Sequence, residues 1–269
     1  MTTTQGLDRD GFIAREGSLD RVPPAFAPVV AAARERIAAA FAPELLHSAY
    51  LYGSVPRGTA IPGVSDLDVL LALHHEPTPA DRAAADALGA ALDAEFAQVN
   101  GVGVELAGVG TLLSELERHD LGWMVACLCT PLLGEDLATR LPRYRPTSLL
   151  ARETNGDLAL VLPRWREGLA AATTDTELRG LSRGISRRLV RTCFTLVMPR
   201  QGGWTSDLAA SAEAFAAHYP EHATHARLAA AIARTPTADR SALTALVDGL
   251  GSWLATEYAA VHGVKAPRP

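Results

Sequence analysis

Two kinds of hydrophobic pattern alternate in the first half of the chain. Short apolar runs with a period of two predict strands, and Ala-rich stretches with a helical period predict helices. In chain order, these are a helix over 24–41, strands over 47–53 and 66–73, a helix over 78–97 and a strand within 100–109. This succession is typical of a small mixed β-sheet with helices packed on it.

The ends of these elements carry local signals. Thr78 is a suitable N-cap, and Pro79 suits the first position of the helix that follows. Residues 111–129 are interpreted as mainly helical, and residues 131–136 as a last short extended piece. Residues 1–22 are polar and irregular, so the first regular element is expected after them.

The pattern changes after Pro146. Long stretches with a period of 3.6 dominate the second half. Pro142 and Pro146 mark residues 140–147 as a linker. The expected helices cover 147–170, 175–198, 205–218, 222–234 and 239–262. The sequence thus predicts an α+β protein with two domains, residues 1–145 around the sheet and residues 146–269 as an all-α helical bundle.

The composition narrows the classes of function. Of the 269 residues, 48% are hydrophobic and 20% are charged, as in ordinary globular proteins. The net charge of −5 argues against nucleic acid as a partner, because proteins that bind a phosphate backbone usually have a basic surface. We find no apolar run long enough for a membrane span and no signal-peptide pattern. Cys127, Cys129 and Cys193 lack zinc-like spacing and are interpreted as buried thiols, so a cytoplasmic location is expected.

The clearest chemical signal is Asp66-Leu-Asp68, at the start of the second predicted strand. Since side chains alternate along a strand, both carboxylates point to the same face, about 7 Å apart along it. Two carboxylates this close repel each other, and a cation between them relieves the repulsion. Oxygen ligands of this kind suit Mg²⁺.

A Gly53-Ser54 turn precedes the two acids by eleven residues, with Arg57 and Ser65 in the intervening loop. Its backbone N–H groups and hydroxyl suit phosphate oxygens. Taken singly, Gly-Ser is common in turns, and Asp-x-Asp is common in loops and calcium sites. Together, at this spacing and between apolar runs, they predict a site for a metal and a nucleoside triphosphate.

A third carboxylate, Glu105, lies on the strand within 100–109. Its face of the strand otherwise carries Gly103 and Ala107, which leaves space in front of the acid, while the other face is branched and apolar. A Glu on such a strand is costly unless it is paired, metal-bound or at a rim. The alternative is an edge strand whose Glu lies in solvent.

The form Gly53-Ser54-x-x-Arg57-Gly58, followed by Ser65-Asp66-x-Asp68, resembles the signature of the nucleotidyltransferase superfamily typified by DNA polymerase beta. It is most similar to the bacterial aminoglycoside (spectinomycin/streptomycin) adenylyltransferases, in which a nucleotidyltransferase domain precedes a helical bundle. The resemblance implies that ATP and a small acceptor bind between the domains, in a function of antibiotic resistance. It implies nucleotide contacts by Gly53, Ser54, Arg57 and Ser65, and Mg²⁺ (or Mn²⁺) binding by Asp66 and Asp68. It also implies that Glu105 completes the metal site or acts as the catalytic base.

The predicted helix over 175–198 carries arginines four residues apart, at 179, 183, 187 and 191, with Arg188 beside them. These side chains share one stripe, so an anion is expected opposite, either a triphosphate or surface carboxylates. Arg191 lies in a mainly apolar stretch that is similar to the adenylyltransferase helix with an ATP-contacting Arg. The resemblance therefore implies that Arg191 contacts the nucleotide.

Two features of the family are missing. The sequence has no acid at the aminoglycoside-binding position near Gly180, and no Lys near Gly202 that would reach the phosphates. An aminoglycoside is therefore a plausible acceptor only by resemblance, with carboxylates supplied by Glu153, Asp157, Asp207 or Glu213. The alternatives are a nucleotidyltransferase that modifies a protein or RNA, and a nucleotide-binding module that has lost catalysis.

Overall fold

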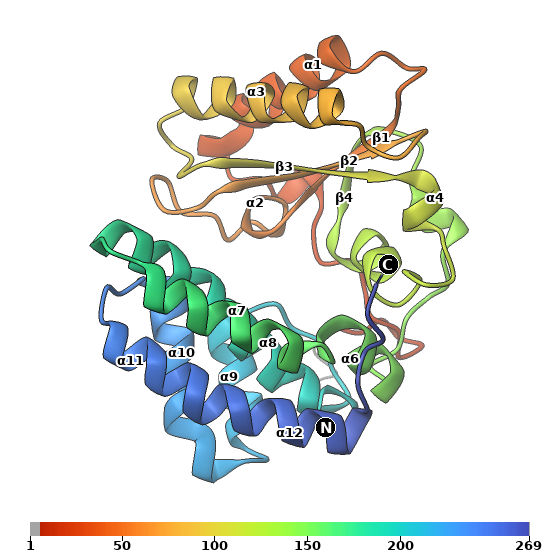
Figure 1. Cartoon of the computed structure of the whole chain (residues 1–269). Helices are drawn as coiled ribbons and strands as arrows, with labels where there is room; N and C mark the ends of the chain where they lie inside the picture. The colour runs from red at the N-terminus through yellow and green to blue at the C-terminus, as the bar shows by residue number, and fades with distance from the viewer. Residues whose placement is uncertain (1–5, 269) are drawn as a thin grey trace. The chain divides into compact units, whose positions relative to one another are not determined.

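The computed structural model describes residues 6–268 and divides into two compact units (Figure 1). One unit is Ala14–Tyr144, and the other contains the chain from Arg145 onward. The segment that ends at Ile13 belongs to the same unit as the chain from Arg145 onward. From the sequence, residues 1–145 were instead assigned to the domain around the sheet. The physical reason is local: the guanidinium of Arg145 lies 3.9 Å above the Phe12 ring, and Gly6 lies against the backbone of Trp204. We call the two parts the sheet unit and the helical unit.

The sheet unit contains a four-stranded sheet in the order β3-β2-β1-β4. Its strands are β1 (Leu46–Tyr52), β2 (Leu67–Leu73), β3 (Val102–Gly108) and β4 (Thr130–Gly134). The strand β1 pairs antiparallel with β2 and β4, and β2 pairs parallel with β3. The predicted small mixed sheet is therefore confirmed.

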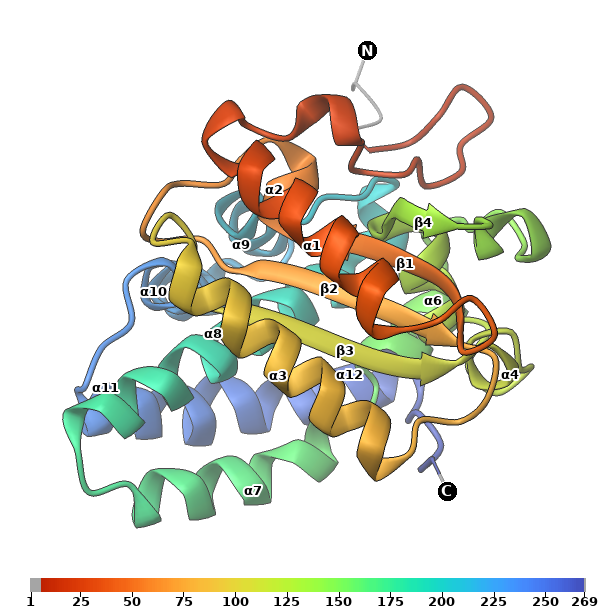
Figure 2. The ribbon, with the colours of Figure 1, turned by 90° about the horizontal axis from the view of Figure 1, so that it is seen from above.

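Two helices cover one face of this sheet, α1 (Ala27–Ala40) and α3 (Pro79–Glu95), as Figure 2 shows. They pack on the alternate residues of β2 that are fully buried, including Val69 and Leu71. Thr78 caps α3: its hydroxyl accepts a hydrogen bond from the Asp81 backbone N–H, and the Asp81 carboxylate accepts one from the Thr78 N–H. This capping box confirms the predicted start of the helix.

The opposite face of the sheet carries a second apolar cluster around Tyr50, Leu70 and Ala72. It is covered by short pieces, α4 (Val109–Leu112), α5 (Leu121–Trp123), a π-helical turn η3 (Met124–Leu128) and η4 (Leu137–Arg140). Residues 111–129 were predicted as mainly helical, but the structure has separate turns there. Further short elements are η1 (Leu19–Arg21), η2 (Pro24–Phe26) and α2 (Ser54–Arg57).

The described part of the helical unit contains helices and no β-strand, in agreement with the predicted fold class. The elements are α6 (Ser148–Asn155), α7 (Leu158–Ala171), α8 (Asp175–Gln201), α9 (Leu208–Ala216), η5 (Pro220–His222), α10 (Ala223–Arg234), α11 (Arg240–Ala245), η6 (Leu246–Gly251) and α12 (Ser252–His262). The long helix α8 contacts most of the others, including α6, α9, α10 and α12. One helix was predicted over 147–170, but the chain breaks between Asn155 and Leu158 and forms two.

The three cysteines are free and buried, as predicted. Burial raises the pKa of the Cys127 thiol to about 12, so this thiol is protonated and unreactive at neutral pH. Within residues 6–268, no helix is long and apolar enough to cross a membrane.

Candidate active site

The Gly53-Ser54 turn follows directly on β1 and brings the backbone against Asp68. Gly53 has φ 81° and ψ −152°, a conformation that L side chains rarely adopt. A Cβ at this position would lie 2.2 Å from Asp68 Oδ2. Both facts require a glycine here. The antiparallel pairing of β1 and β2, with Tyr52 opposite Asp68, is what brings the turn and the carboxylate together.

The loop between the turn and the acids is held by its own polar groups. Thr59 donates its backbone N–H to the Ser54 carbonyl over 3.1 Å. The Ser65 hydroxyl is buried and accepts a hydrogen bond from the Ile61 N–H at 2.9 Å, which closes the end of the loop. Arg57 pairs with Glu16 at 3.6 Å, so this predicted phosphate contact already has an anionic neighbour. The assignments of Ser54, Arg57 and Ser65 to the nucleotide stay predictions.

Asp68 and Glu105 point to the same face of the sheet. In the parallel pairing, Asp68 lies opposite Gly103, and Leu70 lies opposite Glu105, so the two acids are diagonal neighbours on adjacent strands. A Cβ at Gly103 would meet no atom of the described residues within 4 Å. Open space therefore lies beside Asp68 and next to Glu105, as the small residues of β3 predicted. The strand β3 is at the edge of the sheet, and Glu105 is exposed.

Asp66 lies immediately before β2 and is half-buried. Two backbone hydrogen bonds tie this point to the start of β3, from Leu67 N–H to Gly101 and from Asn100 N–H to Ser65. These bonds help to fix the register of β2 and β3, the strands that carry Asp68 and Glu105.

The Tyr52 phenol lies within electrostatic reach of the three acids. Burial raises its pKa, and negative charge nearby raises it further. That charge comes, in decreasing order, from Asp68, Glu105, Cys129 and Asp66. All three carboxylates thus lie within electrostatic reach of one hydroxyl. The sequence interpretation missed Tyr52, although the alternation of β1 puts Tyr50 and Tyr52 on one face.

The three acids suit a divalent cation, because carboxylates offer hard oxygen ligands. In the described part of the chain, however, no three His, Cys, Asp or Glu side chains form a complete metal cluster. A cation here would be held by Asp66 and Asp68 and would need further oxygens from a ligand or water. That requirement agrees with a triphosphate, whose oxygens bind Mg²⁺ in nucleotide sites.

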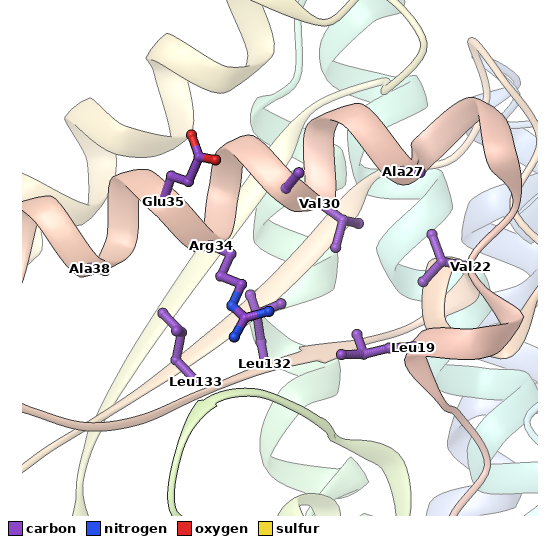
Figure 3. A pocket seen from close by; sticks show the side chains of 10 residues that line it. Leu19, Val22, Ala27, Val30, Arg34, Glu35, Ala38, Leu132 and Leu133 are labelled. Atoms are coloured by element: carbon purple, nitrogen blue, oxygen red, sulfur yellow. The ribbon is translucent and has the colours of Figure 1, made fainter.

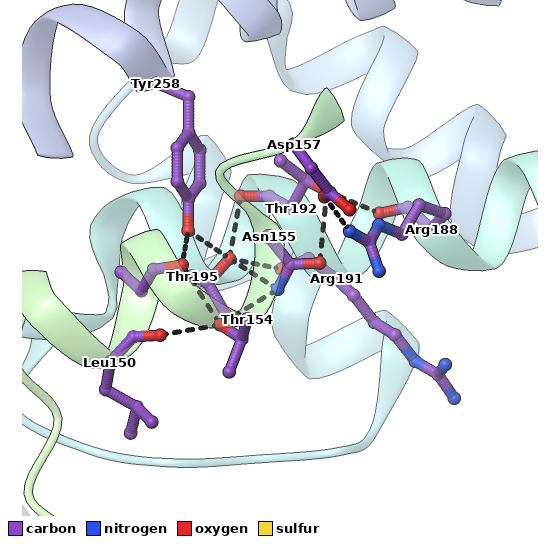
Figure 4. Close-up of polar contacts among 10 residues, drawn as sticks. Leu150, Thr154, Asn155, Asp157, Arg188, Arg191, Thr192, Thr195 and Tyr258 are labelled. Carbon is purple, nitrogen blue, oxygen red and sulfur yellow. Dashed lines mark hydrogen bonds and ion pairs between the residues drawn. The ribbon is translucent and has the colours of Figure 1, made fainter. Parts of the chain in front are cut away.

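Arg191 lies on α8, and its side chain is exposed. The sequence suggested apolar surroundings for Arg191. In the structure, the residues that follow it are buried, whereas Arg191 itself is exposed. Figure 4 shows it directed away from the polar network of Asn155, Thr192 and Thr195. Its predicted contact with the nucleotide stays a prediction.

Two arginines of this helix pair with carboxylates of the helical unit. Arg179 of the stripe pairs with Asp175 at 4.0 Å, and Arg188, beside the stripe, pairs with Asp157. For these two, the structure agrees with the alternative of nearby surface carboxylates.

The carboxylates that the sequence offered to a cationic acceptor also have structural partners. Glu153 pairs with Arg152 and Arg268, Glu213 pairs with Arg227, and Asp207 accepts from the Ala210 N–H at the start of α9. None of these contacts identifies an acceptor site.

A groove of about 580 Å³ lies on the other side of the sheet, between α1 and β4 (Figure 3). Its walls are mainly aliphatic, with Val30, Leu132 and Leu133, and Arg34 and Glu35 stand on α1. Because α1 covers the face that Val69 and Leu71 present, the groove is separated by the sheet from Asp68. It has no part in the site formed by the acids.

Comparisons with known proteins agree with this architecture. The chain matches no known family model and no curated protein sequence. Among solved structures, it is similar to a spectinomycin adenyltransferase, AAD(9) from Enterococcus faecialis, crystallised with ATP and spectinomycin. The similarity covers 86% of this chain and 98% of that chain, with a TM-score of 0.51 and 15% identity. The chain therefore has a fold similar to that of AAD(9), as the resemblance of the motif around Asp66 and Asp68 implied.

Proposed function

We propose that this protein is a Mg²⁺-dependent nucleotidyltransferase that transfers AMP from ATP to a hydroxyl of a small acceptor, of the aminoglycoside or aminocyclitol class. One observation carries the proposal. The Asp68 carboxylate lies against the Gly53-Ser54 turn and shares a face with Glu105, with open space over Gly103 between the strands. The fold that the chain shares with an enzyme crystallised with ATP supports the same reaction.

Each residue has a role in this proposal. The Gly53-Ser54 turn binds the triphosphate through its backbone N–H groups and hydroxyl. Asp66 and Asp68 hold a divalent cation, which would neutralise the triphosphate and orient the α-phosphorus for in-line attack. Arg57 and Arg191 add positive charge for the phosphates, and Ser65 supports the loop.

Glu105 is assigned the proton of the acceptor. As the acceptor oxygen bonds to the α-phosphorus, the bond to pyrophosphate breaks, and the hydroxyl proton passes to the Glu105 carboxylate. The exposed position of Glu105 on an edge strand leaves room for an acceptor in front of it. The acceptor is expected to carry ammonium groups, because the site is rich in carboxylates.

The test is a transfer assay with each nucleoside triphosphate, labelled at the α-phosphate, and a panel of aminoglycosides and aminocyclitols. We expect transfer with ATP and Mg²⁺, release of pyrophosphate, and loss of both after chelation with EDTA. A labelled protein or RNA in lysate would instead support a macromolecular acceptor. ATP binding without pyrophosphate release across the panel would support a binding module that has lost catalysis.

The variant Asp68→Asn removes a charge that the cation needs, and should lower turnover at least about a hundredfold while the protein stays folded. The matched control is Asp93→Asn, on the exposed side of α3 and on the other face of the sheet. Full activity of Asp68→Asn with ATP would contradict the assignment of the metal site.

A further inference from the structure

A segment at the start of the sheet unit, residues 14–22, is fixed in place next to β4. The Glu16 backbone N–H donates to the Cys127 carbonyl at 2.9 Å. The Arg15 guanidinium donates to both carboxylate oxygens of Asp136, at 2.7 and 3.1 Å. We call residues 14–22 the leading segment. These bonds anchor it to the chain on both sides of β4.

The leading segment also lies directly against α2, the single helical turn that ends at Arg57. Ser18 donates its backbone N–H to the Pro56 carbonyl at 3.0 Å. A Cβ at Gly58 would lie 2.8 Å from the Arg21 carbonyl oxygen. The two backbones are therefore in contact both before and after Arg57.

Glu16 and Arg57 form an ion pair at this contact. Glu16 Oε2 lies 3.6 Å from Arg57 Nη1, and the two side chains are only 13% and 28% exposed. An N–H···O hydrogen bond spans about 2.7–3.2 Å, so the pair attracts the guanidinium without engaging one of its N–H donors. Because a guanidinium carries several such donors in a fixed fork, one anion can hold it while another binds.

We propose that Glu16 is a positioning residue for the triphosphate: its carboxylate holds the Arg57 guanidinium beside the Gly53-Ser54 turn, oriented for the phosphates of ATP. The inference rests on the proposed function and adds Glu16 to it. An Arg side chain loses rotamer freedom when it binds an anion, and a partner that restricts it beforehand reduces that loss. Because the leading segment is anchored beside β4, Glu16 restricts Arg57 from a fixed point.

The charge of Glu16 has a second, opposite effect. It repels a triphosphate bound at the turn, and this repulsion does not depend on which side chain occupies position 57. The positioning effect does depend on that side chain. Replacement of Arg57 therefore abolishes one effect and not the other, and a double-mutant cycle separates the two.

The experiment measures the Kd of ATP with Mg²⁺, without an acceptor, by isothermal titration calorimetry. The proteins are the wild type, Glu16→Gln, Arg57→Gln and the double variant. We expect Glu16→Gln to raise the Kd about fivefold, within the range of coupling between groups in contact. In the Arg57→Gln background, the same change should not raise the Kd further. In transfer assays, Glu16→Gln should raise the KM for ATP and leave kcat at saturating ATP unchanged, a split that loss of stability would not produce.

Asp20→Asn is the matched control. Asp20 is an exposed acid of the leading segment, so this variant removes the same charge from the same part of the chain. It should leave the Kd for ATP unchanged. Melting followed by circular dichroism checks that each variant is folded at the temperature of the titration.

The outcomes are distinct. If the wild type neither binds ATP nor transfers a nucleotide, the proposed function fails and the role of Glu16 fails with it. If the wild type binds ATP and Glu16→Gln binds it equally or more tightly, the role of Glu16 is overturned and the proposed function stands. The same holds if Arg57→Gln binds ATP as the wild type does, or if Glu16→Gln weakens binding equally with and without Arg57.

Discussion

The two faces of β2 show how one strand serves two purposes. Leu67, Val69, Leu71 and Leu73 are all fully buried and face the layer of α1 and α3. The other face carries Asp68, then Leu70 and Ala72, and only the last two belong to an apolar cluster. One face holds the strand in place along its whole length, and this anchoring allows the other face to expose acids at one end.

The comparison explains why the acids can be tolerated. Carboxylates that lie close together repel each other, and such repulsion destabilises a folded chain unless a cation is bound. Burial of four large side chains on the opposite face contributes several kcal/mol, at about 1.5–3 kcal/mol for each side chain. The apolar face therefore stabilises the register on which the acidic face depends. Changes to each face should have separable effects.

The largest expected effect is on the buried face. Leu71→Ala removes a fully buried side chain, and should lower the free energy of unfolding by about 2–5 kcal/mol, as found for comparable core truncations. Denaturant titration measures this change. Where the variant is still folded, Mn²⁺ binding with ATP should be that of the wild type. Loss of cation binding in the folded variant would show that the two faces are not separable.

The next effect is on the acidic face. Gly53→Ala would force either the turn or the Asp68 carboxylate to move, because the new Cβ would lie 2.2 Å from Oδ2. Such a shift of the turn or of the Asp68 carboxylate should lower the rate of nucleotidyl transfer about a hundredfold. The measurement is kcat with ATP and the best acceptor of the panel.

Gly63→Ala is the control for Gly53→Ala. Gly63 has φ 73°, so it shares the backbone strain of about 1–3 kcal/mol, but a Cβ there would meet no described atom within 4 Å. This variant should be less stable and should keep the rate of transfer. Equal rates in the two variants would mean that contact with Asp68 does not matter.

The smallest expected effect is at the N-cap of α3, one of the two helices that cover the buried face of the sheet. Hydrogen bonds from the Thr78 hydroxyl and backbone N–H lower the pKa of Asp81 from 3.8 to about 2. Since the pKa is lower in the folded state, this carboxylate stabilises the fold above about pH 4, and the contribution is lost as the pH falls toward 2.

Asp81→Asn should therefore lower the melting temperature slightly at neutral pH, and the gap to the wild type should narrow below about pH 4. Asp86→Asn, exposed on the same helix, provides the control and should show no gap. Thermal unfolding from pH 7 to pH 3 measures both variants. A gap that stays constant over this range would contradict the assignment.

Some expectations from the sequence differed from the structure for a common reason. Residues 111–129 have a helical pattern but form several short elements, which pack on the apolar cluster around Leu70 and Tyr50. Arg191 has apolar sequence neighbours, yet it is exposed, since a helix presents successive residues to different sides. The hydrophobic pattern of a short segment does not show which side of a helix packs against the rest of the unit.

The order of the strands along the chain, the Thr78 cap and the acidic motif could all be predicted from the sequence, because each depends on residues within a few positions of one another. Two strands with Gly53-Ser54 and Asp66-x-Asp68 between them were enough to indicate the fold class and the chemistry. Only the tertiary structure decided that Asp68 lies against Gly53 and opposite Gly103, and that Tyr52 pairs with Asp68 across the sheet. These contacts depend on strand register, which is set by hydrogen bonds and packing between segments far apart in the chain.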